Sequence, residues 1–128
     1  KRAVELRDKI SPETILLGNG DVTTLEEAKE KVDETGVDGV MIGRGIFGNP
    51  WFFSGYQANT EEKLEVMLEH TKLFEEYLPH KNFSVMKKHY KAYVEGFDGA
   101  KELRVKLMET NSSGEVEEIV KDFLNKSS

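Results

Sequence analysis

Two short apolar runs, each closed by glycines, are the feature of this sequence that most limits its fold. The first run, residues 14–17, ends in the tetrapeptide GNGD, and the second, residues 38–42, ends in GRG. Between them, Thr24-Leu-Glu-Glu27 has the form of a capping box and opens a helix that Gly36 ends. A strand, a helix and a strand at this spacing predict a βαβ unit in which two buried strands run parallel.

The pattern becomes entirely helical after residue 55. Asn59-Thr-Glu-Glu62 predicts a cap for a helix that Pro79 stops, and apolar stripes at helical spacing predict three further helices, of which the first extends from Met86 to Phe97. We therefore expect the end of an α/β architecture over residues 1–55 and a small helical bundle over residues 56–128. Because two strands cannot close a parallel sheet and the chain starts at Lys1 without Met, we expect a piece of a longer protein.

Composition excludes several classes of function. The net charge is −6, so no overall basic field attracts nucleic acid or anionic lipid. The absence of Cys excludes disulfides, a thiolate nucleophile and a Cys metal site within this chain. No apolar run approaches the roughly 20 residues that span a bilayer and no signal peptide is visible, so a cytoplasmic location without membrane contact is expected. His70, His80 and His89 lack metal-ligand spacing with nearby carboxylates, and we expect surface or helix-packing roles for them and no metal.

The two glycine turns predict a phosphate site. Parallel strands end at one edge of a sheet, where glycines let a phosphate approach the backbone and Arg44 can supply a charge-assisted contact. In (β/α)₈ barrels the loops after strands 7 and 8 often form such a site. Glycines also end strands and cap helices without binding anything, and this alternative stays open from the turns alone.

A second candidate surface is a basic segment, residues 80–108. It holds seven Lys or Arg against three Asp or Glu, about +4, while the rest of the chain is about −10. Lys87, Lys88 and Lys91 fall on the helix face opposite the apolar stripe. Such a face suits the phosphates of an RNA backbone, and it equally suits an ordinary solvated helix.

The stretch GNGDVTTLEEAKEKVDETGVDGVMIGRGIFGNPWFF resembles the last two βα units of the tRNA-dihydrouridine synthases. The stretch VMKKHYKAYVEGFDGAKELRVKL is more weakly similar to the helical domain of the same family. The resemblance implies the end of an FMN-binding (β/α)₈ TIM barrel followed by a helical domain that docks tRNA. It also implies that the whole enzyme uses NADPH to reduce FMN, which then reduces the C5=C6 bond of a tRNA uridine extruded from its stack.

The family's site residues carry over only where the motifs match. Implied contacts to the FMN phosphate are Asn19, Gly20, Asp21, Gly43 and Arg44, and implied contacts to the RNA backbone are Lys87, Lys88, Lys91 and Arg104. Asn49 and Pro50 match the motif and are expected only to shape the turn, whereas Lys87 and Ala92 replace the Arg and Trp that the family often has.

The family's catalytic cysteine is missing from this chain, and its flavin-side Lys and His lie upstream of the matched region. This chain is therefore expected to hold no catalytic residue and to be inactive alone. Two rival interpretations remain: another FMN-dependent barrel oxidoreductase acting on a small molecule, and a stand-alone RNA-binding helical module.

Overall fold

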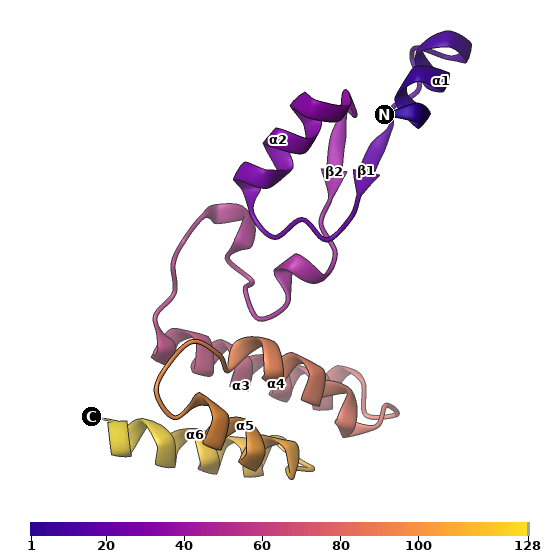
Figure 1. Ribbon diagram of the computed structural model, residues 1–128. Helices are drawn as coiled ribbons and strands as arrows, with labels where there is room; N and C mark the ends of the chain where they lie inside the picture. Colours follow the sequence, from indigo (N-terminus) through magenta and orange to yellow (C-terminus); the bar gives the residue numbers. More distant parts are fainter. Residues whose placement is uncertain (128) are drawn as a thin grey trace. The chain divides into compact units, whose positions relative to one another are not determined.

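The computed structural model describes residues 1–127, which form six α-helices and one small parallel sheet of two strands (Figure 1). In chain order, the α-helices and strands are α1 (Arg2–Ile10), β1 (Leu17–Asn19), α2 (Leu25–Thr35), β2 (Gly39–Met41), α3 (Thr60–Tyr77), α4 (Lys87–Tyr93), α5 (Ala100–Met108) and α6 (Ser113–Ser127). Short 3₁₀ turns cover Arg44–Ile46, Phe52–Ser54 and Phe83–Met86.

The predicted βαβ unit is confirmed. β1 and β2 pair in parallel, with Leu17 opposite Gly39 and Asn19 opposite Met41, and α2 lies against β2. The Thr24 hydroxyl accepts the Glu27 N–H at 3.0 Å, as a helix cap should. The C-terminal ends of both strands therefore lie at the same edge of the sheet, directly before the two glycine turns.

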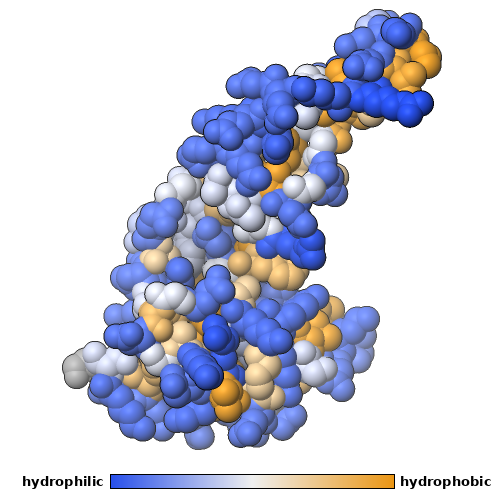
Figure 2. All heavy atoms as spheres, viewed as in Figure 1, coloured by the Kyte–Doolittle hydropathy of each residue, from blue (hydrophilic) through white to orange (hydrophobic). Residues whose placement is uncertain are grey.

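The first strand lies later in the chain than the sequence predicts. Residues 14–16 stay outside β1 because side chains bind their backbone: Arg7 donates to the Thr14 carbonyl at 3.0 Å, and the Leu16 N–H donates to Asp38 at 2.7 Å. The expectation that both strands are buried is also wrong for the described residues, because Leu17 and Met41 are each 54% exposed. α2 packs against β2, but this leaves Leu17 and Met41 largely accessible. Orange apolar spheres accordingly reach the surface of this part of the chain in Figure 2.

The predicted helical bundle has its own core. α3 packs against α4 and α6, and α5 packs against α4 and α6. The predicted stripes supply the twelve buried core residues: Leu64, Met67, Phe74, Met86, Tyr90, Tyr93, Val94, Ala100, Leu103, Leu107, Val116 and Val120. The helix predicted from Met86 to Phe97 is wrong at its end, since α4 stops at Tyr93. The following segment EGFDG contains two glycines, which disfavour further helix.

The chain divides into two compact units. The first contains residues 1–46 and 52–55, and the second contains residues 47–51 and those from Tyr56 onward. No helix within residues 1–127 is long and apolar enough to cross a membrane.

Candidate functional site

The two glycine turns meet through an ion pair between Asp21 and Arg44. Arg44 Nη2 lies 2.6 Å from Asp21 Oδ2 and 2.7 Å from Oδ1, and Arg44 Nε lies 3.0 Å from Oδ1. The hydrogen bonds from Arg44 to Asp21, and then the attraction between their charges, raise the pKa of the guanidinium. Both side chains are mostly exposed. The pair therefore holds the protonated Arg44 guanidinium at the surface, where β1 and β2 end.

The backbones of the two turns also pack closely. A Cβ on Gly45 would collide with the Val22 carbonyl oxygen, and the Val22 side chain is only 4% exposed. Glycine at position 45 is therefore needed for the turns to approach each other. Sequence reasoning missed both residues, although the second glycine of GRG is the signal that could have identified this contact.

Space for a ligand exists at two of the predicted positions. A Cβ built on Gly20 or on Gly43 would meet no atom within 4 Å, so the backbone is open there. Asn19 is also exposed, and Arg44 contributes the cation. Open glycine backbone, an amide side chain and a guanidinium together form a donor set that fits a phosphate.

The side chain of Asp21 binds Arg44 and is not available as a phosphate contact. Its carboxylate is bound to Arg44 and would repel a phosphate. Only its backbone N–H could face the anion, while its side chain orients Arg44. That assignment, like those of Asn19, Gly20, Gly43 and Arg44, stays a prediction.

The start of α2 adds little to this donor set. The Thr24 side chain accepts the Glu27 N–H, and the Glu27 carboxylate accepts the Thr23 N–H at 2.9 Å. Side chains of the first turn thus bind two of the backbone N–H groups here, and the turn carries the acidic residues Glu26 and Glu27. The acidic side chains offset the partial positive charge of the helix N-terminus, so the turns themselves carry the candidate site.

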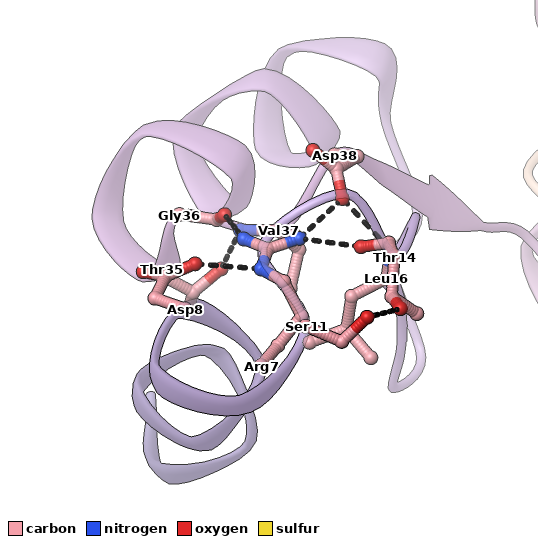
Figure 3. A network of polar contacts seen from close by, with 9 residues as sticks. All are labelled: Arg7, Asp8, Ser11, Thr14, Leu16, Thr35, Gly36, Val37 and Asp38. Atoms are coloured by element: carbon pink, nitrogen blue, oxygen red, sulfur yellow. Dashed lines mark hydrogen bonds and ion pairs between the residues drawn. The ribbon is translucent and has the colours of Figure 1, made fainter.

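At the opposite ends of the strands, Arg7 makes a structural clamp (Figure 3). Its Nη1 lies 2.6 Å from Asp38 Oδ2, and its Nη2 donates to the Gly36 carbonyl at 3.3 Å. The Leu16 N–H, and next the Arg7 guanidinium, hold the pKa of Asp38 below its ordinary value. The clamp joins α1 to the segments before β1 and β2, away from the glycine turns. Its partners are 31 residues apart, so local sequence patterns did not reveal it.

The predicted RNA-contacting residues occupy three different places. Lys88 lies over the Phe47 ring, with its Nζ 5.8 Å from the ring centroid, a cation–π distance. Lys91 and Arg104 line a groove between α4 and α5, where Arg104 Nη1 donates to the Val94 carbonyl at 2.9 Å. Lys87 is half-buried at the start of α4 and does not line this groove.

Two histidines form a packed cluster, as the helix-packing interpretation predicts. The rings of His70 and His89 are 4.8 Å apart, Phe47 stacks on His89 at 5.2 Å, and the Tyr93 hydroxyl lies 3.3 Å from His70 Nδ1. Burial lowers the pKa of both imidazoles, and for His89 the neighbouring His70 and Lys88 lower it further. His80 is exposed. Within residues 1–127 no cluster of His, Asp or Glu is suited to hold a metal ion.

Known proteins match the whole chain. The family model described as dihydrouridine synthase matches residues 1–128. A Staphylococcus epidermidis protein described as a probable tRNA-dihydrouridine synthase is 39% identical over 122 residues, covering 92% of this chain and 37% of that protein. The Bacillus subtilis protein described as probable tRNA-dihydrouridine synthase 2 is 36% identical over 126 residues, covering 95% of this chain and 39% of that protein.

This chain thus spans well under half the length of the relatives it matches. The resemblance that the glycine turns indicate is confirmed along the full sequence. The chain belongs to the dihydrouridine synthase family.

Proposed function

We propose that this chain is the C-terminal portion of a flavin-dependent tRNA-dihydrouridine synthase. In this proposal the βαβ unit is the end of a (β/α)₈ barrel, and residues 56–128 form a helical domain that docks tRNA. The Asp21–Arg44 pair carries the proposal, because it holds a guanidinium where both strands end, next in sequence to the open Gly43. Family membership and the descriptions of its relatives as probable tRNA-dihydrouridine synthases support it.

Each residue of the turns has a defined part in this proposal. Gly20 and Gly43 let the backbone approach the FMN phosphate, Arg44 offsets its charge, and Asp21 keeps the guanidinium in one orientation. Asn19 offers a side-chain amide at the end of β1. When bound, FMN supplies the two-electron chemistry that saturates the C5=C6 bond of uridine, with NADPH as the proposed electron source.

The resemblance to the family implies that a cysteine protonates C5 of uridine, and this chain contains no cysteine, so in this proposal the proton donor lies outside these residues. We therefore propose that this chain alone is inactive and binds FMN weakly. The basic segment supports tRNA over a small-molecule substrate, since a small substrate needs no such surface. The cytoplasmic location stays a prediction.

FMN titration tests the phosphate site in a full-length enzyme that contains this chain. Arg44→Ala should weaken FMN binding about 10- to 150-fold, the effect of losing one charge-assisted contact. Arg2→Ala removes the same charge from an exposed position on α1 and should leave the affinity unchanged. Equal FMN affinity in the Arg44→Ala variant and the wild type would remove Arg44 from the site.

A second assay tests the inactivity of the chain alone. The chain is incubated with NADPH, FMN and unmodified tRNA, and dihydrouridine is measured by mass spectrometry of the nucleosides. No product above a control without protein is expected. Any excess would contradict the proposal that catalysis needs groups outside these residues.

A further inference from the structure

A groove between α4 and α5 combines positive charge with an apolar lining. It encloses about 410 Å³ and is lined by Lys91, Glu95, Lys101, Arg104, Val105 and Met108. Lys91 comes from α4, Glu95 lies just beyond that helix, and the other four residues come from α5. All six belong to the second unit of the chain.

The cations of this groove are held differently. Arg104 is half-buried, and its bond to the Val94 carbonyl fixes the guanidinium against the chain that leaves α4. Lys91 and Lys101 are exposed, one on each helix. The groove therefore has one cation bound to the backbone and two exposed ones, a set of charges that suits an anion.

The apolar part of the groove sets a second requirement for the ligand. Val105 is 58% exposed and Met108 is half-buried, so α5 presents aliphatic surface beside the cations. Phosphate alone gains nothing from such surface, and a flat apolar face without charge gains nothing from the lysines. A ligand that uses both must carry an anionic group and a broad apolar face.

We propose that this groove binds one unpaired nucleotide of an RNA, with its phosphate on Lys91 and Lys101 and its base against Val105 and Met108. The inference rests on the proposed tRNA-docking function and identifies the part of tRNA involved as single-stranded. In an A-form duplex the base faces are stacked and unavailable, whereas an unpaired nucleotide offers both a base face and a phosphate. Glu95, which also lines the groove, repels a phosphate and can accept hydrogen bonds from the N–H groups of a base edge.

The lysine test uses charge reversal with a matched control. In the full-length enzyme, Lys91→Glu with Lys101→Glu is compared with Lys106→Glu and Lys126→Glu, which change the net charge equally but line a different, smaller cavity. Binding of a 12-nucleotide oligouridine is measured from low to high salt. The first pair should lower the slope of log K against log salt by about 1.4 units, and the control pair should leave it unchanged. An equal decrease of the salt slope in both pairs of variants would mean that only the overall charge of the protein matters, and it would overturn the proposal.

The base test varies the RNA. Wild type should bind the oligouridine more tightly than an abasic strand of equal length and more tightly than a 12-base-pair RNA duplex. Val105→Ser with Met108→Ser should abolish the preference over the abasic strand and leave the salt slope intact. Equal binding of the abasic strand by wild type would reduce the groove to a phosphate site and overturn the proposal. Competition by oligoglutamate as strong as by oligouridine would overturn it in favour of an acidic peptide.

Unmodified tRNA separates this inference from the proposed function. If wild type fails to bind tRNA, the docking function fails, while the oligouridine comparisons still decide what the groove binds. If wild type binds tRNA and the Lys91/Lys101 variant binds it with the same salt slope, the docking function stands and the groove inference fails. Circular dichroism confirms that each variant is folded.

Discussion

The hydroxyl groups of Thr71 and Tyr90 lie 3.1 Å apart in the core of the helical unit, where neither residue is exposed. The Thr71 hydroxyl also donates to the Met67 carbonyl at 2.8 Å, so Tyr90 acts as the donor to Thr71 in this chain of bonds. Burial raises the pKa of Tyr90 to about 12, which keeps the phenol protonated at all ordinary pH values. This buried polar link joins α3 to α4 within a core that is mostly apolar.

Removing this link should destabilise the protein modestly. Tyr90→Phe leaves the packing volume intact and deletes one buried hydrogen bond, which should lower the free energy of unfolding by about 0.5–1.5 kcal/mol. Urea unfolding followed by circular dichroism measures the change. Tyr77→Phe is the control, because the Tyr77 side chain is exposed on the same helix as Thr71 and its variant should match the wild type. Equal stability of both variants would show that the buried bond contributes nothing.

Gly48 should tolerate no side chain. Its φ is +71°, and an added Cβ would collide with the backbone of Ala92 and Tyr93 at the end of α4. Gly48→Ala therefore combines a left-handed backbone cost of about 1–2 kcal/mol with overpacking of about 1–3 kcal/mol. Gly96→Ala is the control: its φ is +80° but its Cβ would meet open space, so only the backbone cost is expected. Thermal and urea unfolding should rank Gly48→Ala clearly below Gly96→Ala, and the reverse order would contradict the contact with α4.

Acid should loosen the Arg7–Asp38 clamp. The pKa of Asp38 is lowered in the folded state, so the unfolded chain binds its proton first as the pH falls. The stabilisation is complete above the ordinary aspartate pKa of about 3.9 and is lost as the pH drops through the lowered value. Melting curves between pH 2 and 6 should show that the wild type loses stability as the pH falls, and that Asp38→Asn loses less stability over the same range. Identical pH profiles would place the acid sensitivity elsewhere.

A second pH effect is expected from His70 and His89. Both pKa values are lowered in the folded state, so the unfolded chain takes up protons first as the pH falls below about 6.5. Stability should be full above that value and should decline as the pH falls through the lowered pKa values, because burial disfavours the charged form of both imidazoles and, for His89, His70 and Lys88 add repulsion. The melting temperature should therefore be lower at pH 5 than at pH 8. His70→Gln should reduce that difference, while His80→Gln, at an exposed position, should not.

Local chemistry explains what the sequence predicted well. Asn59 and Glu62 form the expected capping box, with both reciprocal bonds present, and Thr24 caps α2. These features depend on residues three positions apart, so their spacing is visible in the sequence. The apolar stripes of the bundle are equally local, and most of their members are buried.

Contacts between distant residues explain what the sequence did not predict. The start of β1 depends on Arg7 and Asp38, which act on the backbone of Thr14 and Leu16 from other elements. The pairing of Asp21 with Arg44 spans 23 residues and gives Asp21 a partner that no motif spacing indicates. The exposure of Leu17 and Met41 depends on which elements pack against the sheet, and a pattern of apolar residues cannot report that.

The assignment of residues 47–51 to the second unit has a practical consequence for dissecting the protein. The chain passes from the first unit to the second after Ile46, returns at Phe52 and leaves again after Gly55. A helical unit that begins at residue 56 would therefore lack the Phe47 ring that contacts His89. It would also lack Gly48, which packs against the end of α4. A helical unit prepared separately should begin at Phe47, and proteases that nick the exposed stretch 53–57 should release a helical piece lacking part of its own packing.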